Sequence, residues 1–183
     1  MKILVIIGGI SKTSLNKKFF ELIKPLAPKD FEFDTFDISQ LPFFSQDLES
    51  SVPQSVIDFK QKVTDCYAVM FITPEYNRTI PGVLKNAIDW GSRPMSKSVW
   101  KDKPACVLGA SLGPIGTFGA QMHLKETISF LEMHVMYRPE VCFSFSSYVG
   151  KNGELLDLSK KFLIDFLNSF KDGVLKNNKL LLV

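Results

Sequence analysis

Short apolar runs recur along the chain and predict buried strands. Lys2–Ile7, Tyr67–Thr73 and Pro104–Ser111 contain almost no polar residue inside the run. Continuous runs of this kind are typical of strands covered on both faces in a parallel sheet. Phe31–Ile38 instead alternates apolar and polar residues, which indicates a less buried strand nearer a sheet edge. Arg138–Phe145 is predicted as the last strand.

The segments between these strands carry apolar residues at helical spacing. In the first of them Leu15, Phe19, Leu22, Ile23 and Leu26 share one face. Pro81 is expected in the first turn of its helix, where a missing N–H costs nothing. The tail Lys179–Val183 carries no assignment. The predicted helices are Ser14–Leu26, Pro53–Asp65, a helix opened by Pro81, Phe118–Met133 and a final helix marked by Leu155, Leu158, Phe162, Phe166 and Phe170.

The alternation of strand and helix predicts the fold class. Five strand–helix pairs without a break or repeat indicate a single α/β domain over residues 1–183, built on a doubly wound parallel sheet in the order 2-1-3-4-5. The ligand crevice of such a sheet lies outside the carboxyl ends of strands 1 and 3, with strand 4 beside them. This topology nominates three loops, residues 8–16, 74–80 and 111–119.

Composition narrows the class of function. Of 183 residues 45% are hydrophobic, enough for a proper core. Lys and Arg total 22 against 19 for Asp and Glu, and a net charge of +3 spread along the chain argues against a nucleic-acid surface. The first apolar run is too short for a signal peptide, and no segment approaches the roughly twenty apolar residues of a membrane span. We therefore expect a cytoplasmic protein.

Three widely spaced cysteines and two histidines limit the chemistry further. Cys66, Cys106 and Cys142 form no CxxC pair, so neither a disulfide framework nor a zinc site is expected. We expect buried thiols in a reducing compartment instead. His123 and His134 have no Ser or Cys nearby in a nucleophile-elbow context. No metal-ligand cluster is present in the sequence. These residues therefore do not point to nucleophilic or metal-dependent chemistry.

The first loop, residues 8–16, has the groups that suit a phosphate. Gly8 and Gly9 allow a sharp turn, and hydroxyls, an amide and the N–H groups of a helix start follow. Neither a Walker loop nor GxGxxG is present, so a mononucleotide fits better than a dinucleotide. The alternative is an ordinary turn with Ser14 as helix cap.

The other two loops suit a flat ring. In the second, Pro74 and Pro81 stiffen a segment that offers the ring of Tyr76 and the amide of Asn77. In the third, three glycines between residues 111 and 119 allow the backbone to approach a ring closely. The alternatives are a proline-rich connection with an Asn turn and a flexible connection, respectively.

At these residues the chain resembles the NAD(P)H-dependent FMN reductase family, which includes quinone, chromate and azo-dye reductases. The stretch Pro74–Trp90, reading PEYNRTIPGVLKNAIDW, closely resembles the most specific motif of that family. Ser14-Leu15-Asn16, Leu41–Glu49 and the third loop match in place and order. The resemblance implies a flavodoxin-like three-layer sandwich.

The resemblance also implies roles for particular residues. Ser11, Ser14 and Asn16 would hold the FMN phosphate, and Ser111 and Gly113 would approach the flavin from the third loop. Many relatives have arginine where Ser11 stands, so Lys12 would supply the positive charge. The residues implied to line the isoalloxazine, largely through backbone groups, are Pro74, Glu75, Tyr76 and Asn77.

The implied activity is that of an FMN-dependent oxidoreductase, which takes a hydride from NADPH or NADH and reduces quinones or similar small acceptors by a ping-pong mechanism. This mechanism requires no general acid or base, so no side chain is assigned as catalytic. Relatives are homodimers or homotetramers, and the helix end at Ala87-Ile88-Trp90 fits either a contact surface or core. Two other readings stay open. One is an electron carrier or redox sensor that binds flavin without turnover, and the other is an interaction scaffold with an empty site.

Overall fold

A five-stranded parallel sheet forms the centre of the computed structural model, which describes residues 1–180. Its order is β2-β1-β3-β4-β5, and every pairing is parallel, so the predicted 2-1-3-4-5 topology is confirmed. The strands are β1 (Lys2–Ile7), β2 (Glu32–Thr35), β3 (Ala68–Ile72), β4 (Pro104–Ser111) and β5 (His134–Ser144).

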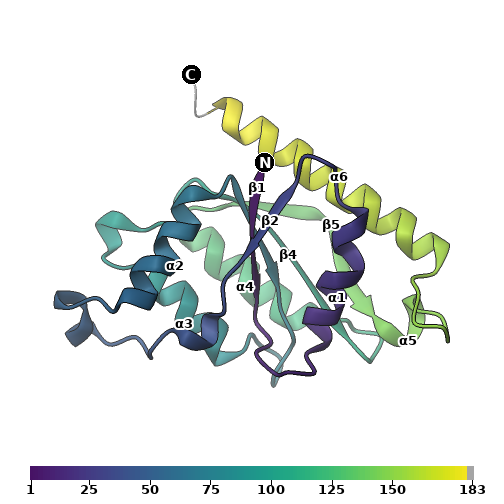
Figure 1. Cartoon of the computed structure of the whole chain (residues 1–183), viewed down its shortest axis with the longest axis horizontal. Helices are drawn as coiled ribbons and strands as arrows, with labels where there is room; N and C mark the ends of the chain where they lie inside the picture. Colours follow the sequence, from purple (N-terminus) through teal and green to yellow (C-terminus); the bar gives the residue numbers. More distant parts are fainter. Residues whose placement is uncertain (181–183) are drawn as a thin grey trace.

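Helices cover both faces of the sheet and give it two separate cores (Figure 1). On one face α1 (Leu15–Ile23) and α6 (Asp157–Leu180) pack on Ile3 and Val5 of β1. Leu4 and Ile6 point to the opposite face, because side chains alternate along a strand. This three-layer arrangement is the flavodoxin-like sandwich. The helices of that second face are α2 (Gln54–Asp65), α3 (Gly82–Gly91) and α4 (Phe118–Phe130).

The continuous apolar runs are buried as predicted, and the alternating run lies at an edge. All five residues of β3 are buried, whereas no residue of β2 is. β2 is shorter than the predicted Phe31–Ile38, because the chain turns away into a 3-10 helix at Ile38–Gln40. The Asp37 carboxylate caps this turn by accepting from the Ser39 N–H at 3.1 Å.

Several predicted boundaries are wrong by a few residues. β5 begins at His134, before the predicted Arg138, and its register with β4 shifts between Cys106 and Leu108. α4 ends at Phe130 rather than Met133, and Glu132 beyond it has a φ of +61°. Pro81 is the N-cap residue of α3 and not part of its first turn.

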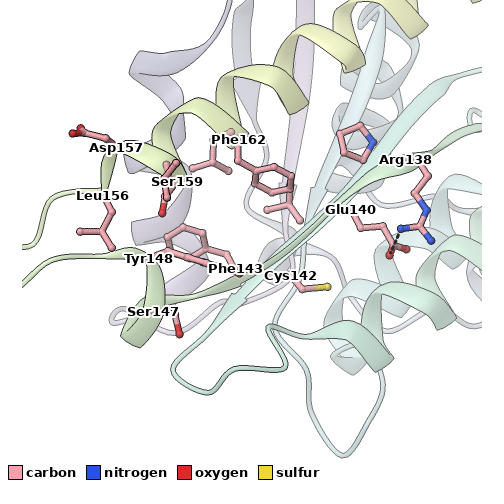
Figure 2. Close-up of a pocket in the computed structure, with 14 residues that line it drawn as sticks. Arg138, Glu140, Cys142, Phe143, Ser147, Tyr148, Leu156, Asp157, Ser159 and Phe162 are labelled. Carbon is pink, nitrogen blue, oxygen red and sulfur yellow. Dashed lines mark ion pairs between the residues drawn. The ribbon is translucent and has the colours of Figure 1, made fainter.

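The last helix, α6, packs on one face of the sheet and contacts the edge strand β5. α6 extends to Leu180, so Lys179 and Leu180 of the unassigned tail are helical, and residues 181–183 lie outside the described residues. A short helix, α5 (Phe145–Tyr148), follows β5, and the first turns of α6 lie beside that strand (Figure 2).

The cysteines are free, as expected, and two of the three are buried. Cys66 and Cys106 are 4% and 0% exposed, and Cys142 is partly exposed. Burial raises the pKa of all three thiols, most strongly that of Cys106, and the nearby Glu140 adds to the effect at Cys142. None of them is activated as a nucleophile, since nucleophilic cysteines need a lowered pKa.

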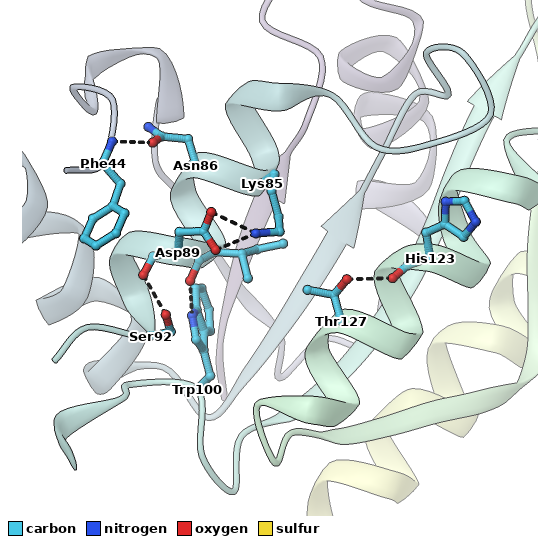
Figure 3. Close-up of polar contacts among 9 residues, drawn as sticks. Phe44, Lys85, Asn86, Asp89, Ser92, Trp100, His123 and Thr127 are labelled. Atoms are coloured by element: carbon cyan, nitrogen blue, oxygen red, sulfur yellow. Dashed lines mark hydrogen bonds and ion pairs between the residues drawn. The ribbon is translucent and has the colours of Figure 1, made fainter. Parts of the chain in front are cut away.

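The two glycines at the ends of α3 give a matched test of the packing. A methyl group at Gly91 would lie 2.4 Å from ring atoms of Trp100, a fully buried side chain whose indole N–H donates to the Ile88 carbonyl at 2.8 Å (Figure 3). We expect Gly91→Ala to lower the free energy of unfolding by about 1–3 kcal/mol. Gly82 has no atom within 4 Å of that position, so Gly82→Ala should raise it by about 0.4–1 kcal/mol. Urea titration measures both, and equal effects would contradict the packing described.

Candidate functional site

The three nominated loops leave the sheet side by side. The Gly8 N–H donates to the Ile72 carbonyl and the Thr73 N–H to the Leu108 carbonyl, both at 2.9 Å. The carboxyl ends of β1, β3 and β4 are therefore joined by hydrogen bonds close to the points where the loops begin. Pro74 lies against Gly8 and Gly9, which brings the first and second loops into contact.

Each of these loops exposes large apolar side chains. Ile10 of the first loop is 48% exposed, and Tyr76 of the second is 53% exposed. The third loop and the start of α4 expose Leu112, Ile115 and Phe118. Apolar groups gathered on adjacent loops at a sheet edge are typical of a ligand-binding surface.

The first loop presents hydroxyl groups beside the start of α1. The hydroxyls of Ser11 and Thr13 lie 3.3 Å apart and are exposed, and Lys12 between them is exposed as well. Ser14 is the N-cap of α1, and its hydroxyl oxygen accepts from the Lys17 N–H at 3.4 Å. The cap interpretation is therefore correct, and it leaves the Ser14 hydroxyl hydrogen available to an anion.

Asn16 has a structural task that the sequence did not reveal. Its side chain is 2% exposed, donates to the Ala110 carbonyl at 3.1 Å and accepts from the Ala110 N–H at 2.9 Å. These two bonds tie the first turn of α1 to the end of β4, directly before Ser111. The side-chain oxygen is thus already used, whereas the backbone N–H of Asn16 has no partner within residues 1–180.

The second loop forms a tight turn at its tip. Asn77 and Arg78 have φ values of +50° and +68°, the pattern of a type I′ turn. The backbones of Tyr76 and Thr79 close the turn with reciprocal hydrogen bonds of 2.9 and 3.0 Å. This geometry fixes the backbone next to Tyr76 and leaves its ring in solvent.

A carboxylate attaches this turn to α4. Glu75 accepts from the Ala120 N–H at 3.1 Å, and its other oxygen lies 3.6 Å from the Arg78 guanidinium. The N-cap of α4, Thr117, makes no side-chain cap, so Glu75 caps the helix from a different loop. A methyl group at Gly119 would approach both the Glu75 carboxylate and the Arg78 carbonyl to 3.1 Å, so this close contact favours glycine.

A second contact joins the same two elements. The Nδ1 atom of His123 on α4 lies 3.1 Å from the Thr79 hydroxyl. His123 therefore helps to position the second loop. Sequence reasoning missed this pair because the two residues are 44 positions apart.

The third loop has an unusual backbone conformation, and the side chain of Gln121 holds it in place. Gly116 and Thr117 have φ values of +57° and +67°. The Gln121 amide donates to the Gly116 carbonyl at 3.2 Å and to the Val141 carbonyl at 2.9 Å, while its oxygen has no partner within residues 1–180. Gly116 must be glycine, because a methyl group there would meet the backbone of Cys142 at 2.3 Å.

The two predicted residues of the third loop lie together at its start. The Ser111 hydroxyl donates to the Gly113 carbonyl at 3.0 Å. Gly113 has open space where a side chain would be, with no atom within 4 Å. A ring could therefore approach the backbone at Gly113 directly.

The segment that follows β2 is fixed on α3. The Asn86 amide accepts from the Phe44 N–H at 2.8 Å (Figure 3) and donates to the Pro42 carbonyl at 3.0 Å. The Trp90 indole donates to the same carbonyl at 2.7 Å. Ile88 and Trp90 are buried in this chain at 1% and 2% exposure, so they belong to the core and the contact-surface alternative for them is wrong.

The donors present fit FMN. Exposed hydroxyls, the unpartnered Asn16 N–H and Lys12 suit a phosphate at the start of α1. The exposed apolar groups and the accessible backbone at Gly113 suit a flat ring. Among residues 1–180 no group of three His, Cys, Asp or Glu side chains could hold a metal ion. None of the helices described there has the length and apolar character to cross a membrane.

Known proteins resemble this chain in sequence and in structure. A 2-hydroxy-1,4-benzoquinone reductase from Burkholderia sp. is 41% identical over 172 residues, covering 93% of this chain and 94% of that protein. A quinone reductase from Pseudomonas putida is 37% identical over 175 residues, covering 94% of each. The solved structure of FerB, a flavoenzyme NAD(P)H:(acceptor) oxidoreductase from Paracoccus denitrificans, superposes with a TM-score of 0.90 at 36% identity over 96% of this chain and 98% of that one.

The family model described as NADPH-dependent FMN reductase matches residues 1–147, which include all three loops. Together with the relatives and the topology, this match confirms the resemblance drawn from the sequence. The chain belongs to the NADPH-dependent FMN reductase family.

Proposed function

We propose that the loops at the carboxyl edge of the sheet bind FMN and use NADPH or NADH to reduce quinones or similar small acceptors. The observation that carries this proposal is the shared exposure of apolar side chains on three adjacent loops, next to the hydroxyls and free N–H at the start of α1. The quinone reductases named among the relatives support the substrate class.

The phosphate would lie at the start of α1. Ser11 and Ser14 would donate through their hydroxyls, and Asn16 through its backbone N–H, because its side chain is occupied by Ala110. Lys12 would add a positive charge, and the N-terminal end of the helix favours an anion in addition.

The isoalloxazine would lie between the second and third loops. Pro74, Tyr76 and Asn77 would line it, and Ser111 and Gly113 would approach from the other side. Glu75 would act through α4, since its carboxylate caps that helix and fixes the backbone of the second loop. Backbone N–H groups of these loops would stabilise negative charge that develops on reduction.

Bound FMN would supply the hydride and electron chemistry. The chain would position the reactants: Tyr76, Leu112 and Ile115 offer the exposed apolar surface on which a nicotinamide and then a quinone could lie in turn. Because the two substrates would share one place, the oxidised nucleotide would leave before the quinone binds, as in a ping-pong mechanism. No side chain is needed as a general acid or base.

We further propose a homodimer or homotetramer in the cytoplasm. Large apolar side chains away from the three loops support an assembly, among them Phe43 at 85% and Phe130 at 78% exposure. Three free cysteines fit a reducing compartment.

Turnover separates the reductase from the electron carrier. With 1,4-benzoquinone in excess, the FMN-loaded protein should oxidise many equivalents of NADPH or NADH. Initial rates at several quinone concentrations should give parallel double-reciprocal lines. A carrier would instead consume one equivalent of nucleotide per flavin and stop, and intersecting lines would contradict a shared substrate place.

Substitution of Glu75 tests the link between the second loop and α4. Glu75→Ala should lower the free energy of unfolding by about 1–2 kcal/mol, the usual cost of a lost helix cap. It should also weaken FMN binding about tenfold, which corresponds to about 1.4 kcal/mol. Glu75→Gln retains an oxygen acceptor and should keep most of both properties.

Glu126, exposed on the same helix, provides the control. Glu126→Ala should change the free energy of unfolding by no more than about 0.5 kcal/mol and leave FMN binding unchanged. Urea titration and flavin fluorescence give the two quantities. Equal behaviour of Glu75→Ala and Glu126→Ala would show that the cap does not hold the loop.

A further inference from the structure

A large pocket lies away from the three loops, between the free edge of β5 and the first turns of α6 (Figure 2). Its volume is about 1160 Å³, and α5 forms part of its wall. No residue of the loops at 8–16, 74–80 or 111–119 lines it. It is therefore a different site from the proposed flavin site, and its existence does not depend on the proposed function.

Aromatic and aliphatic side chains form most of its walls. Phe143 on β5 lies 5.3 Å, centroid to centroid, from the ring of Tyr148 on α5. Leu156 and Phe162 face the pocket from the side of α6 and are 46% and 44% exposed. Exposed rings and branched side chains that converge on one cavity are typical of a site for an apolar small molecule.

One serine of this pocket is largely buried as a residue, but its hydroxyl is accessible from the pocket. Ser159 is 8% exposed, and no hydrogen bond of its hydroxyl is found within the part of the chain that the structure describes. Serines in helices commonly donate to the carbonyl four residues earlier, as Ser169 of the same helix does to Asp165 at 2.8 Å. Figure 2 shows the Ser159 hydroxyl directed into the pocket, where a ligand oxygen could pair with it.

The charges around the pocket favour an uncharged ligand. Arg138 lies 3.4 Å from Glu140, whose other oxygen accepts from Lys125 at 2.9 Å, so this arginine is already paired. Asp157 stands at the opposite end with its side chain fully in solvent. Asp157 is paired with Lys160 at 3.8 Å, so each charged residue that lines the pocket already has a partner of opposite charge within the chain.

The edge of β5 is poorly suited to another strand. Pro139 has no N–H to donate, and charged residues flank it on both sides. Proline and charged side chains are the devices by which edge strands avoid pairing with a further chain. A small molecule is therefore the better occupant than an extended peptide.

We propose that this pocket binds an uncharged, mainly aromatic molecule that carries one hydroxyl or carbonyl oxygen, and that this oxygen hydrogen-bonds to Ser159. The exposed side chains of Tyr148, Leu156 and Phe162 provide the apolar surface for the ligand. The serine hydroxyl can donate or accept, so both kinds of oxygen are compatible with it.

Binding of 2-naphthol to the FMN-loaded protein, measured by calorimetry, tests the proposal. Ser159→Ala should weaken binding about two- to tenfold, the usual loss for one hydrogen bond. Phe162→Ala should weaken it as well, whereas Ser169→Ala on the same helix should leave it unchanged. 2-Naphthalenesulfonate, which has the same rings and a negative charge, should bind more weakly than 2-naphthol.

Three results would overturn the proposal. The first is no binding of 2-naphthol to the wild-type protein, and the second is equal binding by wild type, Ser159→Ala and Phe162→Ala, which would place the molecule elsewhere. The third is that Phe162→Glu forms a smaller oligomer than wild type. Such a result would mean that another subunit of the wild-type protein, and not a small molecule, covers this face. Thermal unfolding of the protein freed of FMN gives a second readout, in which 2-naphthol should stabilise wild type more than Ser159→Ala.

Discussion

The hydrogen bond from Ala120 to the Glu75 carboxylate is the contact on which the site depends most. It joins the loop after β3 to the first turn of α4, and it supplies the cap that Thr117 does not provide for that helix. Because the helix and the turn at Asn77 share this group, the second loop cannot move without uncapping α4. The Thr79–His123 contact reinforces the same link one turn further along the helix. The second loop, which belongs to the proposed flavin site, is thus held in place by its contacts with α4.

The parallel sheet explains why these loops meet. Its two cores bury both faces of β1 and β3, so only the strand ends are free to carry polar groups and exposed apolar side chains. The exposure of Ile10, Tyr76 and Leu112 costs solvation energy that a folded core would avoid. Such a cost is typical of a functional surface. A flat cofactor with a phosphate would cover these apolar groups, and its phosphate would accept hydrogen bonds from the donors beside them. The family match and this geometry therefore support the same reductase function.

The sequence predicted the layers better than the contacts. The strands β1, β3 and β4 could be located because continuous apolar runs are stable where both faces of a strand are covered. Right-handed crossovers then limited the possible strand orders. The predicted start of β5 lies too far along the chain, because the register of this strand is irregular and Pro139 interrupts its apolar pattern. The role of Asn16 could not be predicted from the sequence, since its partner Ala110 lies 94 residues away and their contact depends on how α1 packs on the sheet. The same holds for Glu75 and for the unpartnered hydroxyl of Ser159, which only the folded chain reveals.

The central claim is that the carboxyl edge binds a flavin mononucleotide, with its phosphate held at the start of α1. The most direct test compares the affinities of FMN and riboflavin, which differ only by that phosphate, through quenching of flavin fluorescence. Two or more charge-assisted hydrogen bonds of about 1.5–3 kcal/mol each predict that FMN binds at least about a hundredfold more tightly. Equal affinity for the two flavins, or no binding of either, would contradict the account.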